Sequence, residues 1–297
     1  MSAVAKPFQE ATVRAAVAAL RRDGGTRRFL VADEVGLGKT VVARDVIARL
    51  AVRRRKPFVV FYITSGKVGD QNKRDLLDWL PEEQRKAALS GADRLGLIPF
   101  TKTPKCPIHL YALTPGTSFP PADTRSSPGR ALERALISRL LRKCDPEAHR
   151  LLGHRYFQLA AIKSWPDAMK DAKKIMRAGA NGLETSFTKA LRAEFAPLTV
   201  IGSIALGKEH PYTLIARLRR AMAEASLAAN APDLVILDEF QCYRRLLFPA
   251  TKDRIARRLI GTNSSVARRP AVLLLSATPY RSYAERWESG PGTSPHM

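Results

Sequence analysis

The chain is short of cysteines, of acidic residues and of long apolar runs, and each shortage excludes a class of protein. Its three cysteines, Cys106, Cys144 and Cys242, lie far apart, so neither a disulfide framework nor a metal-binding quartet is indicated. The five histidines are scattered and show no metal-ligand spacing. No stretch is apolar for long enough to cross a membrane, and residues 1–9 lack the apolar core of a signal peptide. We therefore expect a soluble protein of a reducing compartment, in the cytoplasm and, in a bacterium, associated with the nucleoid.

The scarcity of acidic residues leaves a large positive charge. The 297 residues include 50 Lys and Arg against 27 Asp and Glu, which gives a formal net charge of +23. Such an excess attracts polyanions through counterion release and steers their association. Solubility alone is a poor explanation for so much charge of one sign. An anionic membrane surface would call for a strongly amphipathic basic anchor, and none stands out. The charge favours a nucleic acid as partner.

One segment with two glycines lies between a strand-like run and a helical stretch. It reads Asp33-Glu34-Val35-Gly36-Leu37-Gly38-Lys39-Thr40 and separates the apolar residues 29–32 from the helical stretch 41–53. In such a context, backbone N–H groups of the turn and of the helix start point at phosphates. Lys39 would reach the β- and γ-phosphates, and the Thr40 hydroxyl would hold Mg²⁺. Asp33 stands where the usual phosphate-loop pattern has its first glycine, so an ordinary glycine turn is the alternative.

Two later segments support a nucleotide site. The apolar run 234–237 ends in Asp238 and Glu239, and the run 271–275 ends in Ser276-Ala277-Thr278-Pro279. In phosphate-loop enzymes the first acid holds Mg²⁺ and a second polarises the attacking water. A solvated strand end is the alternative for the two acids. Ligands of open α/β sheets bind at the carboxyl ends of strands, so three such ends in this order predict a nucleoside triphosphate site.

Together these segments resemble the first RecA-like domain of superfamily-two helicases, and Asp33 to Thr40 looks most like the Swi/Snf-type branch of DNA translocases. The resemblance implies ATP and Mg²⁺ as cofactors. It also implies that Gln9 reads adenine, that Gly36, Gly38, Lys39 and Thr40 bind ATP, and that Thr40 and Asp238 hold the metal. Lys39, Asp238 and Glu239 would be catalytic, while Gln241, Ser276 and Thr278 would couple the nucleotide state to nucleic acid. Gln241 departs from the family, which often has His or Asp there, so no class of DNA or RNA box is assigned.

Two further strand ends lie where the family has nucleic-acid contacts. The first loop follows the apolar run 57–63 and the second follows the run 108–113. Their hydroxyl, amide and cationic donors suit a phosphate backbone. The alternative for both is a structural turn, since Thr-Pro-Gly is a good turn sequence. The expected contact residues are Thr64, Ser65, Lys67, Thr114, Gly116 and Thr117.

A long interruption separates the second of these loops from the acidic strand end. Thr114 and Asp238 are 124 positions apart, more than a simple crossover needs. Helical periodicity over much of this stretch predicts a basic helical insertion at 128–197, within a RecA-like core formed by 1–127 and 198–283 and followed by a flexible tail, 284–297. The insertion could clamp nucleic acid, and an ordinary solvated face is the alternative. The cations proposed for the clamp are Arg139, Arg142, Lys143, Lys170, Lys173 and Lys174.

The sequence thus predicts an α/β fold: a RecA-like P-loop NTPase domain with a mostly parallel sheet, helices on both faces and a helical insertion. The predicted function is the N-terminal ATP-binding lobe of an ATP-dependent DNA helicase or translocase. An RNA helicase lobe, or a nucleic-acid-binding module that holds ATP without turnover, is the alternative. Because helicases of this kind place the nucleotide between two lobes, we expect a second RecA-like lobe as partner, in the same protein or in trans, and weak activity without it.

Overall fold

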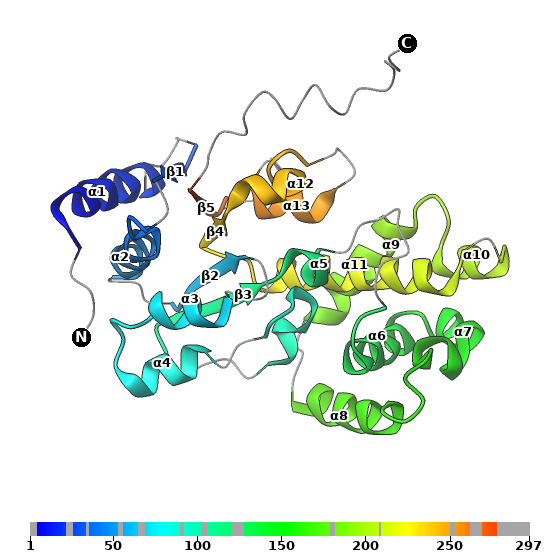
Figure 1. Ribbon diagram of the computed structural model, residues 1–297. Coiled ribbons are helices and arrows are strands. Elements are labelled where there is room, and N and C mark those ends of the chain that lie inside the picture. Colours follow the sequence, from blue (N-terminus) through cyan, green and yellow to red (C-terminus); the bar gives the residue numbers. More distant parts are fainter. Residues whose placement is uncertain are drawn as a thin grey trace, which may run out of the picture.

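Figure 1 shows the computed structural model of the protein, which describes residues 5–21, 26–33, 36–52, 56–64, 69–89, 92–101, 106–119, 128–178, 182–207, 209–249, 253–261 and 269–277. Within these residues, five strands form one all-parallel sheet in the order β1-β5-β4-β2-β3. Their bounds are Arg28–Ala32 (β1), Phe58–Ile63 (β2), Ile108–Leu113 (β3), Leu234–Asp238 (β4) and Ala271–Ser276 (β5). The predicted α/β fold with a parallel sheet is confirmed.

Helices cover both faces of this sheet. In β2, Val60 and Tyr62 join one hydrophobic core, and Phe61 and Ile63 join the other, because successive side chains of a strand point to opposite faces. The near-continuous burial of such strands is typical of a parallel sheet covered on both sides. The first face carries α1 (Pro7–Arg21), α2 (Lys39–Ala51), α3 (Gly69–Asp75) and α4 (Glu82–Leu89). The second carries η1 (Leu95–Phe100), α11 (Pro211–Ala229), α12 (Arg244–Leu247) and α13 (Arg254–Leu259).

Short turns follow α3, β3 and β4. Helix α3 ends at Asp75, and tighter turns follow, in which the Leu77 amide donates to the Arg74 carbonyl and the Leu80 amide to the Leu77 carbonyl. These turns bury Leu76, Leu77 and Leu80 together against the sheet. The loop after β3 contains one helical turn, α5 (Pro115–Ser118), and a short η2 (Phe240–Tyr243) follows β4.

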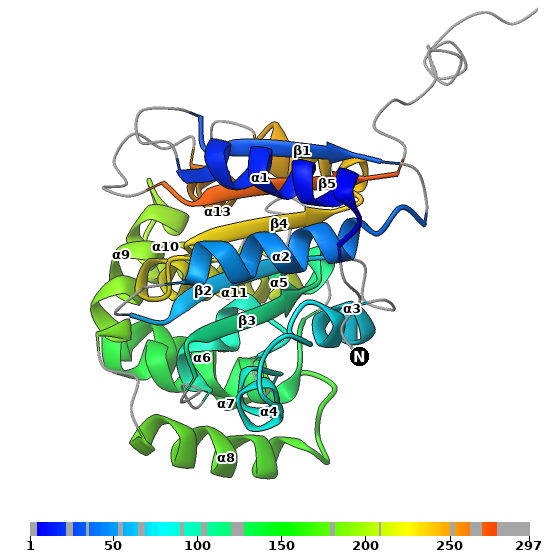
Figure 2. The ribbon, with the colours of Figure 1, turned by 90° about the vertical axis from the view of Figure 1, so that its left-hand side faces the viewer.

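The helical insertion has a hydrophobic core of its own. Its helices are α6 (Ala131–Cys144), α7 (Pro146–Gln158), α8 (Trp165–Ala178), α9 (Leu183–Phe195), α10 (Val200–Ala205) and α11. Figures 1 and 2 show α6, α7 and α8 grouped beside the sheet, with α8 outermost. Helices α10 and α11 lie beyond residue 197, where the insertion was expected to end. Helix α11 contributes to two cores: Leu218 and Met222 pack into the insertion, whereas Ala223 and Leu227 pack against the sheet.

None of the helices in the described part of the chain combines the length and the apolar character that a membrane span requires.

Candidate nucleotide-binding site

The strands end level with one another at one edge of the sheet. Ala32, the last residue of β1, pairs in register with Ser276, the last of β5. Asp238, the last of β4, pairs with the residue before Ser276. Ile63 and Leu113, the last residues of β2 and β3, also pair. The five segments with candidate site residues that follow strands therefore start from the same edge (Figure 2), where ligands of open parallel sheets bind; Gln9 comes from α1.

The glycine turn leads from this edge into α2. Gly36 and Gly38 have φ of 87° and 82°, a left-handed conformation that glycine adopts at no steric cost. Gly38 is the N-cap of α2 and makes no side-chain capping bond, so no capping side chain competes with a phosphate at this helix start. Lys39 Nζ lies 3.1 Å from the Asp33 carbonyl oxygen, which places the ammonium across the turn. Thr40 lies in the first helical turn, and Glu34 and Val35 lie outside the described residues.

Gln9 ties the first helix to this turn. Its side chain is only 6 % exposed, and its Nε2 donates to the Leu37 carbonyl at 2.8 Å. Its Oε1 accepts a 2.8 Å hydrogen bond from the Lys6 amide. The amide group of Gln9 is thus fixed beside the glycine turn, although the two segments are 28 residues apart.

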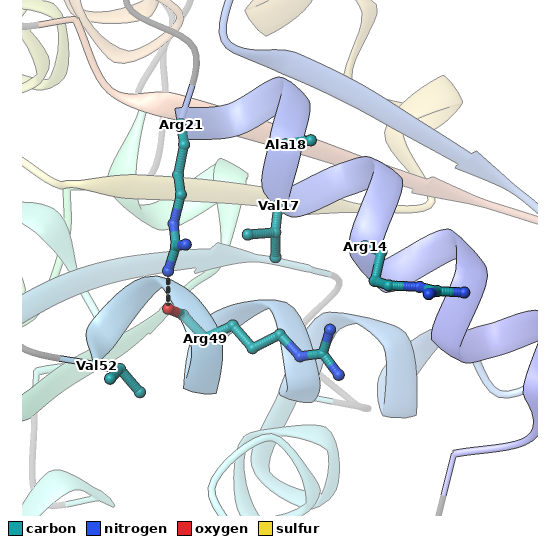
Figure 3. A pocket seen from close by; sticks show the side chains of 6 residues that line it. All are labelled: Arg14, Val17, Ala18, Arg21, Arg49 and Val52. Carbon is teal, nitrogen blue, oxygen red and sulfur yellow. Dashed lines mark hydrogen bonds between the residues drawn. The ribbon is translucent and has the colours of Figure 1, made fainter.

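A surface hollow of about 440 Å³ between α1 and α2 holds none of the candidate site residues. Figure 3 shows three arginines around it, Arg14, Arg21 and Arg49. Arg21 donates to the Arg49 carbonyl, and Arg49 forms a 2.6 Å ion pair with Glu10. Two of the three arginines thus fasten α1 to α2 and thereby help to hold Gln9 in place.

Asp238 has a partly buried carboxylate held by two donors. The Tyr62 hydroxyl donates to Oδ2, and Asn72 Nδ2 lies 3.3 Å from the same oxygen. Burial raises the pKa of Asp238, and the charge of Glu239 raises it further. The hydrogen bonds from Tyr62 and Asn72 and the charge of Lys39 act in the opposite direction. Burial, and after it the Asp238 charge, raises the pKa of Tyr62, so this phenol remains a donor.

Glu239, Gln241 and Ser276 form one hydrogen-bonded chain. Gln241 Nε2 donates to Glu239 Oε2 at 2.6 Å, and Ser276 Oγ donates to Gln241 Oε1 at 2.8 Å. Glu239 has a positive φ of 54°, which is uncommon for a residue other than glycine and turns the chain sharply after β4. The structure thus brings together two of the three residues expected to couple the site to nucleic acid; Thr278 lies outside the described residues.

The two candidate nucleic-acid loops differ in how much of them is described. Thr64 is 5 % exposed and its amide donates to the Leu113 carbonyl at 3.3 Å, while Ser65 and Lys67 lie outside the described residues. In the second loop, Thr114 precedes α5, and Thr117 Oγ1 donates to its carbonyl at 3.1 Å. A Cβ on Gly116 would meet nothing within 4 Å, so the turn is open at that point.

A buried ionic cluster, formed by Arg94, Glu133 and Arg219, anchors the second loop. Arg219 Nε lies 3.0 Å from Glu133 Oε1, and its Nη2 donates to the Thr117 carbonyl at 3.0 Å. Arg94 reaches the other oxygen of Glu133 at 3.4 Å. Glu133 and Arg219 are 3 % and 2 % exposed. The insertion therefore fixes the position of the turn that carries Thr114, Gly116 and Thr117.

Sequence reasoning missed several residues that build this site. Tyr62 could have been noticed, because a hydroxyl near the end of an otherwise apolar strand needs a polar partner when buried. Asn72 follows the first candidate nucleic-acid loop in the sequence, but its hydrogen bond to Tyr62 depends on how α3 packs. Glu133 and Arg219 are 86 positions apart and lie in different helices, so no local pattern connects them.

The donor set fits magnesium better than a transition metal. Over the described ranges, no group of three His, Cys, Asp or Glu side chains comes together to hold an ion. Mg²⁺ commonly takes one or two carboxylates together with substrate phosphates and water. Asp238 at the end of β4 and Thr40 at the start of α2 supply one carboxylate and one hydroxyl of that kind.

Comparison of this chain with protein-family models, with curated proteins and with solved structures gives no match. Fold alone does not define function, so any functional conclusion depends on the site residues themselves.

Proposed function

We propose that this chain is the ATP-binding lobe of a nucleic-acid helicase or translocase, most similar in its motifs to the DNA translocases. The observation that carries the proposal is the common sheet edge, where the phosphate-loop segment, the acidic pair and the Ser276 segment all begin. Any one of these segments has an ordinary structural explanation. Their convergence on one edge, beside an uncapped helix start, favours a triphosphate site.

Each residue has a role that matches its surroundings. Lys39 lies across the turn, where its charge would meet the β- and γ-phosphates. Gln9, held beside Leu37, would read adenine. Asp238 and Thr40 would hold Mg²⁺, which neutralises charge on the transferring phosphoryl group when it is bound. Glu239 would accept a proton from the attacking water.

The nucleic-acid part of the proposal is supported by the net charge and by the two loops that follow β2 and β3. The net charge of +23 suits a polyanion, and Thr64 and Thr114 follow strands that end at the ATP edge. The hydrogen bonds that link Glu239, Gln241 and Ser276 would transmit a movement of the Glu239 carboxylate to the end of β5. A second RecA-like lobe is the partner that would supply an arginine to the γ-phosphate.

The deciding assay measures two properties of the purified chain: Mg²⁺-dependent binding of a fluorescent ATP analogue, and phosphate release with no nucleic acid, single-stranded DNA, duplex DNA or RNA. Glu239→Gln serves as the blank and Glu184→Gln, an exposed carboxylate on α9, as the control. DNA-stimulated release that Glu239→Gln removes supports the proposal, and stimulation by RNA alone favours the RNA helicase alternative. Binding without release, even after a RecA-like second lobe is added, supports the non-hydrolysing module. Absence of ATP binding would contradict all three.

A further inference from the structure

A cluster of basic side chains lies in the insertion, between α6 and α8. A hollow of about 110 Å³, here called the basic hollow, separates the two helices. Five of its six lining side chains are cations, and among the described residues no acid lines it. Helix α8 lies on the outer side of the insertion (Figures 1 and 2) and contacts α6, and four of the lining cations are exposed, so the basic hollow is at the surface. The lining residues are Arg139, Arg142, Lys143, Lys173, Met176 and Arg177.

The cations come from matching faces of the two helices. Residues three and four apart lie on the same face of a helix, which holds for 139, 142 and 143 on α6 and for 173 and 177 on α8. Like charges at this spacing repel each other and destabilise a helix. Attraction to the helix dipole accounts for cations in the last turns, such as Arg142 and Arg177, but it falls off beyond that turn and leaves Arg139 and Lys173 unexplained.

Among the described residues, four of these five cations lack the acidic partners that other arginines of the insertion have. Arg219 pairs with Glu133 at 3.0 Å, and Arg220 pairs with Glu194 at 3.4 Å. In the basic hollow, Lys143 pairs with Glu184, whereas the other four cations form no ion pair to any residue that the structure describes. The Nε of Arg139 is buried and has no hydrogen-bond partner there. Burial, together with the charges of Arg142 and Arg177, lowers the pKa of Arg139.

The size of the basic hollow limits what can bind. Pockets for drug-sized ligands measure about 300–1,000 Å³, so a volume near 110 Å³ suits a compact anionic group rather than a whole nucleotide. Arginine presents a planar set of donors that matches the oxygens of a phosphate, and three of the five cations are arginines. A phosphate group would satisfy the buried Arg139 Nε and screen the repulsion among its neighbours.

We propose that the basic hollow binds a backbone phosphate of the nucleic acid on which this lobe acts. The proposal rests on the proposed function for the identity of that nucleic acid. Helix α6 connects the two regions, because Glu133 near its start anchors the Thr114–Thr117 turn and Arg142 near its end lines the basic hollow. Nine residues of α-helix span roughly 14 Å, at about 1.5 Å per residue. A nucleic-acid strand that crosses the turn could therefore continue along α6 to the basic hollow at the other end of that helix.

The test compares two double variants that remove the same amount of charge. Arg142→Gln/Lys173→Gln removes one exposed cation from each helix of the basic hollow. Lys189→Gln/Arg192→Gln removes an exposed lysine and an exposed arginine from α9, outside the basic hollow. Affinity for a labelled 20-nucleotide DNA is measured by fluorescence anisotropy over a series of salt concentrations, with melting temperature and ATP-analogue binding as checks on the fold.

The basic-hollow variant should lose at least about fivefold in DNA affinity, and its plot of log affinity against log salt should become shallower by about one for each DNA phosphate that is no longer neutralised. The α9 variant should lose less than about twofold and keep its slope, as expected for a general field effect. Equal decreases in the two variants would overturn the proposal. The proposal would also be overturned if binding of inorganic pyrophosphate required Arg142 and Lys173 but binding of DNA did not, since the ligand would then be a free phosphate. Failure of the unmodified chain to bind DNA or RNA would refute the nucleic-acid function and the basic-hollow proposal together, whereas normal DNA binding by the basic-hollow variant would refute only the latter.

Discussion

The Nε2 of Gln9 lies 2.8 Å from the carbonyl oxygen of Leu37, so the first helix is joined directly to the glycine turn. A Cβ on the next residue, Gly38, would lie 2.4 Å from the same Nε2, so a side chain there would force Gln9 to move. A residue expected to read adenine and a residue expected to bind phosphate are thus packed against each other. The contact requires glycine at 38 for two reasons, its left-handed backbone and its missing side chain.

Alanine substitutions at Gly36 and Gly38 separate the effect of backbone strain from the effect of the contact with Gln9. Gly38→Ala adds a methyl group that collides with Gln9 and also strains a φ of 82°, whereas Gly36→Ala strains a φ of 87° and meets nothing within 4 Å. Alanine at a positive φ costs about 1 kcal/mol or more, and both variants should show this cost in thermal unfolding. Gly38→Ala should be the less stable of the two and should bind an ATP analogue more weakly, because Gln9 must move. Equal stability and equal ATP affinity in the two variants would show that the Gln9 contact is unimportant.

The second prediction concerns Lys39. Lys39→Ala should abolish ATP-analogue binding or weaken it severely, because the ammonium lies across the turn where phosphates would bind. The melting temperature should fall by no more than about 4 °C, since the half-buried ammonium gives up a hydrogen bond worth about 1 kcal/mol. The matched control is Lys163→Ala, an exposed lysine of the insertion. Unchanged ATP affinity in a folded Lys39→Ala protein would refute the phosphate-loop assignment.

Asp238→Asn tests the acidic strand end in both stability and activity. Because burial raises the pKa of Asp238, the folded state holds the proton more tightly than the unfolded state. Its stabilising contribution is therefore present at low pH and is lost as pH rises through the raised pKa. At pH 8 the variant, whose amide oxygen still accepts from Tyr62, should melt about 2 °C or more above the unmodified protein. That difference should shrink towards pH 4, and Mg²⁺-dependent ATP hydrolysis should be lost at every pH. A melting difference that does not change with pH would contradict the assigned pKa direction.

The strands and their order along the chain could be predicted from sequence because their apolar runs are local. The run from Ile108 to Leu113 becomes β3 with the expected bounds. The partners of Asp238 and Glu133 could not be predicted, because each contact depends on how distant elements pack. Helix α11 shows the same limit: its apolar residues predict a helix, but only the packed structure shows that it serves two cores.

The next prediction concerns how the affinity for DNA depends on salt concentration. The unmodified chain should bind DNA with little sequence preference, and its affinity should fall at least about tenfold between 50 and 200 mM salt if several phosphates are neutralised. The physical reason is counterion release from the polyanion by a chain of net charge +23. Fluorescence anisotropy with single-stranded DNA, duplex DNA and RNA of equal length gives both the slope and the preferred partner. A flat salt response, or no binding at 50 mM, would remove the nucleic-acid interpretation of the charge.

The last prediction concerns the buried cluster of Arg94, Glu133 and Arg219. Glu133→Gln keeps the shape of the side chain but removes the charge that two arginines face, and Arg219 is only 2 % exposed. Removing one partner of a buried ion pair leaves an uncompensated charge, which costs about 3–5 kcal/mol. We expect a decrease near the lower end, about 3 kcal/mol in urea unfolding, because the amide of glutamine still accepts one hydrogen bond. Glu184→Gln, whose pair with Lys143 is exposed, should cost less than about 1 kcal/mol. Arg219 also donates to the Thr117 carbonyl, so Glu133→Gln should speed amide hydrogen exchange in residues 114–119, whereas Glu184→Gln should not. A decrease in stability without faster exchange there would mean that the cluster supports the insertion but does not position the turn.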